Sequence, residues 1–176
     1  NHFVEIHSEF TGFTKFIMVN LNFINSNYIL RTILISKTLA NKLTTINRKK
    51  ILVLHDGVDV KNFRYKKKEK KIKSVTYVGS FHEGKGVELI LELAKKFRNL
   101  KFNIYGKPLT SFHDTSENLK IHGYINYNQV PRVLANSDVL LLPSAEKQFV
   151  GMNVNVTNYN SPLKMFDYLA SGKLII

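Results

Sequence analysis

Short apolar runs alternate with amphipathic segments along most of the chain. Runs rich in apolar and β-branched residues predict strands at 3–7, 28–35, 50–54, 74–78, 102–105, 119–122, 139–142 and 173–176, of which 28–35 also suits a passage from helix to strand. Apolar residues at helical spacing predict helices at 14–24, 37–46, 87–97, 128–135 and 162–171. Apolar strands that alternate with helices are typical of a parallel sheet covered by helices on both faces, which binds ligands at the carboxyl ends of its strands.

The last predicted helix carries the features of an anion-binding site. Ser161 is suited to cap it, Pro162 takes its first position, and Gly172 signals its end. The first amides of a helix lack intrahelical partners and the helix dipole is positive there, so this end favours an anion. Asp167 lies beyond the first turn, where it cannot cap. It either binds a second polar group of a ligand or lies on the solvated face.

Composition narrows the class of protein without deciding its function. With 176 residues, 44% hydrophobic and 22% charged, the chain has the balance of one globular domain or of part of a larger protein. It contains no cysteine, which excludes disulfides and thiolate metal sites. The formal net charge of +13 permits nucleic acid, anionic lipid headgroups or phosphorylated small molecules as partners, although abundant Asn, Ile and Lys also arise from nucleotide bias in an AT-rich genome.

The start of the sequence and its apolar segments were compared with the patterns of signal peptides and membrane spans. The start lacks the basic and then apolar pattern of a secretory signal peptide. The most apolar early stretch, 16–34, is interrupted by several asparagines and an arginine and is too polar for a membrane span. Because the sequence opens in one predicted strand and closes in another, we expect it to be a fragment of a longer protein.

A glycine-bearing loop joins the strand 74–78 to the helix 87–97. Its glycines let a phosphate approach the backbone, and Lys85 adds a cation near the start of the helix. The spacing matches neither a Walker loop nor the G-x-G-x-x-G dinucleotide motif, so a plain connection with a solvated lysine explains it at least as well. The histidines do not fall at metal-ligand spacing with acids, and no G-x-S-x-G nucleophile motif is present.

Short motifs occur in a fixed order across nearly the whole chain. They are VEIH (4–7), ILIS (33–36), VLHDGVD (53–59) with Phe63, YVGS (77–80) with GKGV (84–87), IYG (104–106), HGY (122–124), VP (130–131) with SDVLLLPS (137–144), and SPLKMFDY (161–168) with GK (172–173). In this order they resemble the motifs of retaining glycosyltransferases of the GT-B type, in particular the large family 4 of sugar-nucleotide-dependent enzymes, in a variant that carries SPLK. Each motif is degenerate alone, but few α/β proteins outside this family reproduce them all.

The resemblance implies a Rossmann-like parallel sheet within a GT-B architecture, in which two such domains face each other across a cleft. It places residues 1–50 at the end of the N-terminal, acceptor-side domain and residues 51–176 in the donor-nucleotide domain, truncated at its C-terminus. The implied activity is transfer of a sugar from a nucleoside-diphosphate sugar to a saccharide or lipid-linked acceptor with retention, in cell-envelope polysaccharide synthesis. It implies a cytoplasmic enzyme, free or peripherally bound to the inner face of an anionic membrane, without cofactor, metal or nucleic acid.

The same resemblance assigns roles to residues that match the family's motifs. Lys85 is implied to contact the donor diphosphate and to support catalysis, and His7 to face the donor sugar as a second catalytic residue. Asp167 is implied to accept hydrogen bonds from the ribose hydroxyls, for which a carboxylate is chemically apt. The other implied donor-binding positions are Gly79 and Ser80 of the glycine loop, Gly123, Tyr124 and Ile125 beside the base, Tyr159, and Ser161, Pro162, Leu163 and Lys164, around which backbone amides hold the phosphates.

Three positions depart from the family's pattern. Asp167 stands where the family usually has Glu, which shortens the reach by one methylene. Ser80 stands where many members have Arg, so one phosphate-binding cation is absent. Tyr159 stands at the first glutamate of the family's E-x7-E pair, which SPLK-type members often lack, so we interpret it as a subgroup trait. Lys85, the helix dipole and amides would meet the diphosphate charge without a metal, and we expect no protein nucleophile.

Two alternatives remain open from the sequence. A non-catalytic fragment or pseudoenzyme would hold a nucleotide without transferring sugar. A basic nucleic-acid-binding α/β module would interleave aromatic residues with Lys and Arg on one face, whereas the basic residues here are scattered over predicted linkers and helix surfaces. Steep salt dependence of binding to any DNA would identify the nucleic-acid binder.

Overall fold

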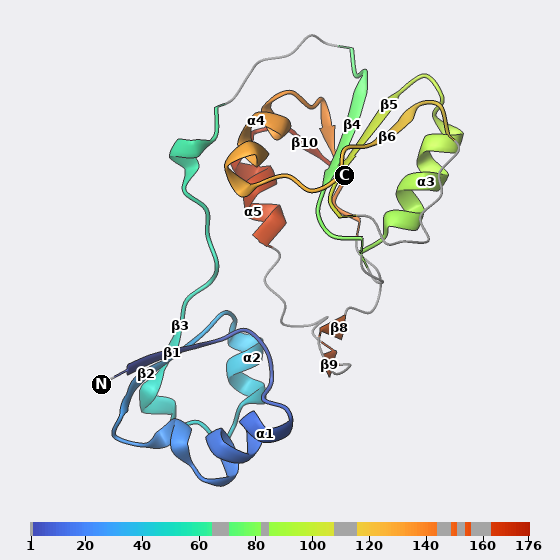
Figure 1. Cartoon of the computed structure of the whole chain (residues 1–176). Helices are drawn as coiled ribbons and strands as arrows, with labels where there is room; N and C mark the ends of the chain where they lie inside the picture. The colour runs from blue at the N-terminus through green and yellow to red at the C-terminus, as the bar shows by residue number, and fades with distance from the viewer. Residues whose placement is uncertain are drawn as a thin grey trace. The chain divides into compact units, whose positions relative to one another are not determined.

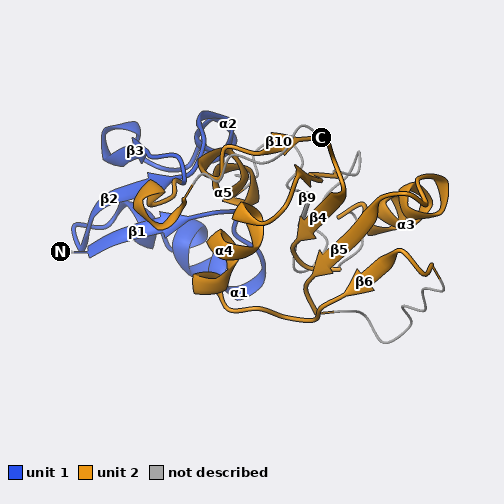
Figure 2. Ribbon diagram, turned by 90° about the horizontal axis from the view of Figure 1, so that it is seen from above, with its two compact units in different colours: residues 1–56, 147–161 blue, residues 57–146, 162–176 orange. Residues whose placement is uncertain are grey.

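The chain forms two compact units, each built on its own parallel sheet. The structure is a computed structural model that describes residues 2–64, 71–81, 85–107, 116–143, 149–150, 154–155 and 163–176. Figure 1 labels most of their helices and strands. Unit 1 comprises Asn1–Asp56 and Lys147–Ser161, and unit 2 comprises Gly57–Glu146 and Pro162–Ile176 (Figure 2).

Unit 1 contains a three-stranded parallel sheet in the order β1-β2-β3. Its strands are β1 (His2–Ile6), β2 (Ile29–Leu34) and β3 (Ile51–Val53), and α2 (Lys37–Lys42) connects the last two. The Ser36 hydroxyl caps α2 by accepting a hydrogen bond from the Leu39 amide at 3.1 Å. The apolar core of this unit consists of Ile6, Ile24, Ile29, Leu34, Ile35, Leu39, Ala40, Leu43 and Ile46.

One expectation for this part of the chain is wrong. The predicted helix over 14–24 is broken into α1 (Gly12–Lys15), a π-helical turn (Phe16–Asn20) and a 3-10 turn (Phe23–Asn25). Asn22 ends the helical path because its backbone is left-handed, with a φ of 56°, which asparagine tolerates better than most residues. β3, which begins at residue 51, pairs with β2 and so belongs to the sheet of unit 1.

Unit 2 contains a five-stranded parallel sheet in the order β10-β7-β4-β5-β6. Its strands are β4 (Ser74–Val78), β5 (Lys101–Tyr105), β6 (Leu119–Ile121), β7 (Val139–Leu140) and β10 (Leu174–Ile175). The chain builds outward from β4 to β6 and then returns to the other side of β4 with β7. This reversal creates a switch point between β4 and β7, and parallel sheets of this kind bind ligands at the carboxyl ends of the strands beside it.

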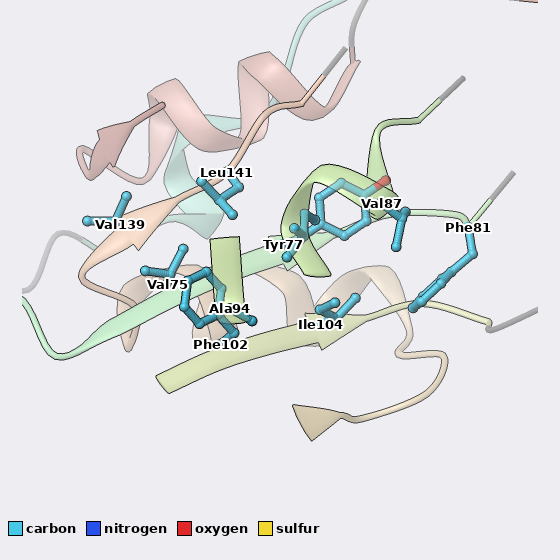
Figure 3. Packing of buried hydrophobic residues seen from close by; sticks show 10 residues of the cluster. Val75, Tyr77, Phe81, Val87, Ala94, Phe102, Ile104, Val139 and Leu141 are labelled. Atoms are coloured by element: carbon cyan, nitrogen blue, oxygen red, sulfur yellow. The ribbon is translucent and has the colours of Figure 1, made fainter. Parts of the chain in front are cut away.

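Helices cover both faces of this sheet, as the alternation of strands and helices predicted. On one face, α3 (Val87–Lys96) packs against inward side chains of β4, β5 and β7, which Figure 3 shows as one cluster. On the other face, α4 (Val130–Ala135) and α5 (Leu163–Ala170) pack around the buried ring of Tyr168 and the side chain of Leu140. Alternate residues of the run that begins with β7 serve two separate cores. Val139 and Leu141 belong to the core beneath α3, and Leu140 and Leu142 to the core beneath α4 and α5, which explains why this run is apolar throughout.

Two residues of the SDVLLLPS motif stabilise the sheet. The Ser137 hydroxyl donates a hydrogen bond to Thr76 Oγ1 at 2.8 Å in the interior of the unit. The Asp138 carboxylate accepts hydrogen bonds from the backbone amides of Lys73 at 3.1 Å and Ser74 at 2.9 Å. Asp138 acts where β4 begins and Ser137 acts at its middle residue, so these motif positions hold the strand in place.

The remaining elements are short. The strands β8 (Phe149–Val150) and β9 (Val154–Asn155) pair antiparallel. Further 3-10 turns occupy Arg48–Lys50, Val60–Asn62 and Tyr127–Gln129, the last of which leads directly into α4. No helix in the described part of the chain is long and apolar enough to cross a membrane.

Candidate functional site

The loops that follow β4, β5 and β6 are tied together at the carboxyl end of the sheet in unit 2. The Gly79 amide donates a hydrogen bond to the Tyr105 carbonyl at 2.9 Å, and the Gly106 amide donates one to the Gly123 carbonyl at 2.8 Å. A Cβ atom on Gly106 would collide with the Gly79 carbonyl oxygen and lie 3.0 Å from the Phe81 ring. Glycine therefore permits a close backbone approach here, and the three loops form one fixed edge.

The side chain of Lys164, from the first turn of α5, lies across Gly79. Its Nζ atom is 3.9 Å from the centre of the Tyr77 ring, and the Tyr77 hydroxyl donates a hydrogen bond to the Ser80 carbonyl at 2.9 Å. A Cβ atom on Gly79 would lie 2.7 Å from Lys164 Cε and 2.9 Å from the Tyr77 hydroxyl oxygen. The glycine loop and the beginning of α5 therefore meet at the carboxyl end of β4.

Lys164 holds its amine where a positive charge is poorly stabilised. Burial, and to a lesser degree repulsion by Lys85, lowers the pKa of Lys164 to about 7. No salt bridge to an acid joins either lysine within the described residues. Anionic oxygens beside both lysines would supply the counter-charge, so the arrangement suits a phosphate-bearing ligand.

Asp167 lies further along α5 and is held by a tyrosine from another element. The Tyr127 hydroxyl donates a hydrogen bond to Asp167 Oδ1 at 2.8 Å. Burial raises the pKa of Asp167, and the bond from Tyr127 acts in the opposite direction. Burial, then the bond to Asp167 and the nearby negative charges, raises the pKa of Tyr127 to about 12, so the phenol keeps its proton at neutral pH. The half-buried carboxylate of Asp167 is thus held in place as a hydrogen-bond acceptor.

Tyr168 fixes α5 to the end of β4. Its side chain is fully buried, and its hydroxyl oxygen accepts a hydrogen bond from the Val78 amide at 2.9 Å. Burial raises the pKa of Tyr168, which keeps the phenol neutral. Because Val78 is the residue before Gly79, this bond positions α5 and Lys164 relative to the glycine loop.

The loop after β6 adds an exposed edge to the same end of the sheet. Gly123 adopts a φ of 75°, which favours glycine, and the Tyr124 side chain that follows is 75% exposed. Ile125 packs instead against the core beneath α4. The loop therefore offers an exposed ring on an anchored backbone, which suits contact with a flat group such as a base.

Side chains of β5 and the residue after β6 form a second polar surface on the face covered by α4. The rings of Tyr105 and His122 stack with their centres 4.3 Å apart and an angle of 8° between planes, and His122 Nε2 is 2.9 Å from Asn103 Oδ1. Burial, then repulsion by Lys120, lowers the pKa of His122. Tyr105 and Asn103 also line a cavity of about 380 Å³ beside α4.

The predicted donor-binding residues that the structure describes all lie in unit 2. Gly79, Ser80 and Lys85 follow β4, Gly123, Tyr124 and Ile125 follow β6, and Leu163, Lys164 and Asp167 belong to α5. Of these, Gly79, Lys85 and Lys164 come together, whereas Asp167 pairs with Tyr127. Tyr159, Ser161 and Pro162 lie outside the described residues.

His7 follows β1 in unit 1, where its Nε2 atom is 3.0 Å from Glu5 Oε1. One carboxylate oxygen each of Glu5 and Asp56 and one ring nitrogen of His7, the atom types that bind metal ions, all lie within 4.8 Å of one another. Spacing along the sequence does not show this group, because its members come from two different strands and the residues after them. Residues after β1 and β3 emerge at the same edge of a parallel sheet, which brings groups distant in sequence together.

Sequence reasoning missed the two tyrosines that support the site. Tyr77 lies in a run of apolar strand residues, where the pattern shows only a core position. Tyr127 lies between Asn126 and Gln129, whose side chains form a capping box. The N-x-x-Q spacing was a readable signal for a helix start, but the contact from Tyr127 to Asp167 arises only in the fold.

Comparison with known proteins identifies the family. Residues 59–155 match the family described as Glycosyl transferases group 1, and the chain belongs to that family. An uncharacterized 41.2 kDa protein in the cps region of Klebsiella pneumoniae is 26% identical over 134 residues, which cover 67% of this chain and 37% of that protein. The chain therefore matches little more than a third of the length of this curated relative.

Solved structures of low sequence identity share the fold. Anabaena Alr3699/HepE, in complex with UDP and glucose, has a TM-score of 0.65 and 14% identity over 98% of this chain and 51% of its own. A mutant of S. aureus TarM, in complex with UDP, fondaparinux and alpha-GlcNAc-glycerol, has a TM-score of 0.64 and 17% identity over 98% of this chain and 36% of its own. The Rossmann-like fold of the GT-B glycosyltransferases, predicted from the sequence, is thereby confirmed.

Proposed function

We propose that the protein carrying this chain transfers a sugar from a nucleoside-diphosphate sugar to a saccharide or lipid-linked acceptor with retention of configuration. The observation that carries the proposal is the pair Lys85 and Lys164, which repel each other at the carboxyl end of β4 and have no acidic partner in the described part of unit 2. Membership of the glycosyl transferases group 1 family supports the reaction class.

Each group of the proposed site has a part in binding the donor. Lys85, Lys164 and the first amides of α5 neutralise the diphosphate, whose negative charge grows as its bond to the sugar breaks. Asp167 accepts hydrogen bonds from the ribose hydroxyls, and the loop 123–125 borders the base. Gly79 leaves room for the phosphates and for Lys164 at the same time.

The proposed reaction exchanges one bond of the anomeric carbon for another. The bond from this carbon to the β-phosphate oxygen breaks, a bond to the acceptor oxygen forms on the same face, and the acceptor proton leaves with the diphosphate. We assign no protein nucleophile, so the rate comes from stabilising the leaving group and from holding the two substrates in position. His7 is proposed to face the donor sugar from the acceptor-side domain.

The cellular role proposed is synthesis of cell-envelope polysaccharide. The relative in the Klebsiella cps region and the saccharides bound by the TarM mutant support an acceptor of this class. The proposed location is cytoplasmic, and the formal net charge of +13 supports peripheral association with an anionic membrane. No cofactor or metal is part of the proposal.

Titration of the purified protein with UDP and GDP by calorimetry tests the donor site. At least one nucleotide should bind, and Lys85→Ala should weaken it by about 1.5–3 kcal/mol, the range of a charge-assisted hydrogen bond. Lys101→Ala is the matched control, because Lys101 is exposed and begins β5 at the opposite end of the strand. Equal affinity of Lys85→Ala and the native protein would contradict the proposal, and binding without sugar transfer to any acceptor would favour the non-catalytic alternative.

A further inference from the structure

Tyr127, which lies outside the family-like motifs, holds the acid of the proposed ribose site. Its hydroxyl donates a hydrogen bond to Asp167 Oδ1 at 2.8 Å, joining the segment after the base loop to α5. We propose that Tyr127 is a positioning residue for nucleotide recognition, which holds the Asp167 carboxylate in the orientation that receives the ribose hydroxyls. This inference rests on the proposed function, because it takes Asp167 as the ribose acceptor.

The backbone around Tyr127 is anchored, so its side chain approaches Asp167 from a fixed point. The Asn126 amide donates a hydrogen bond to Gln129 Oε1 at 3.0 Å, and the Asn126 side chain accepts one in return from the Gln129 amide. Val130, the next residue, is buried in the core that α4 shares with α5. The two ends of the Tyr127–Asp167 contact therefore stand on elements that are packed together.

The chemistry of the contact leaves Asp167 able to bind a diol. A carboxylate has about four acceptor positions on its two oxygens, and Tyr127 uses one of them. Asp167 Oδ2 has no hydrogen-bond partner among the described residues, so vicinal hydroxyls can still bind to the two oxygens. Burial raises the pKa of Asp167, and the hydrogen bond from the phenol acts against this rise. The phenol keeps its own proton at neutral pH, so Tyr127 remains the donor and Asp167 the acceptor.

The contact also explains how an aspartate serves where the family usually has the longer glutamate. An aspartate has fewer rotatable bonds than a glutamate, so one hydrogen bond is enough to fix its orientation. Without that bond the carboxylate must be ordered when the nucleotide binds, which costs affinity. The loss should fall on the ribose contact and not on the diphosphate.

The test compares Tyr127→Phe with the native protein, using UDP, 2′-deoxy-UDP and pyrophosphate as ligands. We expect Tyr127→Phe to weaken UDP binding by about 3- to 10-fold, to lower the ratio of the UDP and 2′-deoxy-UDP affinities, and to leave pyrophosphate binding unchanged. Tyr28→Phe is the control, because Tyr28 is 69% exposed in unit 1. Thermal unfolding of each variant shows that it is folded.

Measuring Tyr127→Phe a second time, in a protein that also carries Asp167→Glu, separates a positioning role from a general structural effect. In Asp167→Glu the longer side chain reaches the ribose without the same support, so the loss caused by Tyr127→Phe should be smaller there than with Asp167. Equal losses in both backgrounds, an unchanged UDP affinity, or an equal loss for pyrophosphate would each overturn the positioning role while the donor site stands. A native protein that binds neither UDP nor GDP would overturn the proposed function, and this role with it.

Discussion

Lys164 should take up a proton when a nucleoside diphosphate binds. In the unliganded protein its amine is buried beside Lys85 and over the Tyr77 ring, and its pKa is about 7. At pH 8 about nine in ten molecules therefore carry neutral Lys164. A bound diphosphate stabilises the charged form and raises this pKa, so binding at pH 8 should consume about 0.9 proton per nucleotide.

The same shift sets the pH dependence of affinity. If the amine stays charged in the complex, the dissociation constant should rise about eightfold from pH 7.5 to 8.5. The terminal phosphate of UDP is already ionised over this range, so its own titration contributes little. The sign follows from proton uptake: the complex holds one more proton than the free protein, and higher pH therefore disfavours binding.

Calorimetry in buffers of different ionisation enthalpy measures the uptake directly. Lys164→Arg is the informative variant, because a guanidinium stays charged and should bind UDP with little proton uptake and a flat pH profile. Lys101→Arg should behave as the native protein, because Lys101 is exposed. UDP binding with no proton uptake at pH 8 and a flat profile in the native protein would refute the account of Lys164.

Three further predictions test the surroundings of this lysine. Asp167→Asn should weaken the binding of UDP and reduce discrimination against 2′-deoxy-UDP. The test needs four dissociation constants, for the native protein and the variant with each ligand, and fully additive losses would remove Asp167 from the site. Gly106→Ala should lower the midpoint of thermal unfolding more than Gly79→Ala. The methyl added at Gly106 meets backbone, whereas the methyl added at Gly79 meets the flexible end of Lys164, and the reverse order of midpoints would contradict this. Tyr168→Phe should cost about 1–3 kcal/mol in chemical denaturation, because the Val78 amide loses its acceptor, and an unchanged midpoint would show that the bond is dispensable.

The fold of unit 2 could be predicted largely from local sequence. The run 74–78 is rich in β-branched and aromatic residues, and β4 occupies those same residues. The helix over 87–97 was found because its apolar residues recur at helical spacing, and α3 ends one residue earlier. Such signals are local, since each element's pattern shows which of its sides is buried.

The failures come from effects that local pattern does not carry. The helix over 14–24 was misjudged because the backbone of a single asparagine, Asn22, turns left-handed. The apolar run of β3 does not reveal that this strand joins the sheet of unit 1. Spacing along the chain also does not show that Asp56, which follows β3, approaches Glu5 at the end of β1 and His7 just after it.

The candidate site was predictable in its parts but not in its electrostatics. Glycine, lysine and aspartate positions were found because the motifs resemble those of a known family. The lowered pKa of Lys164 depends on burial against Tyr77 and on the approach of Lys85, which are tertiary contacts. The hydrogen bond from Tyr127 to Asp167 likewise joins a motif residue to one that lies outside every short motif.

The most direct test of the central claim is a crystal structure of the protein with a bound nucleoside diphosphate. The account predicts the diphosphate beside the amines of Lys85 and Lys164 at the start of α5, with both ribose hydroxyls on Asp167 and the base along the loop 123–125. A nucleotide found elsewhere, for instance in the cavity lined by Asn103 and Tyr105, or phosphates that touch neither lysine, would contradict it.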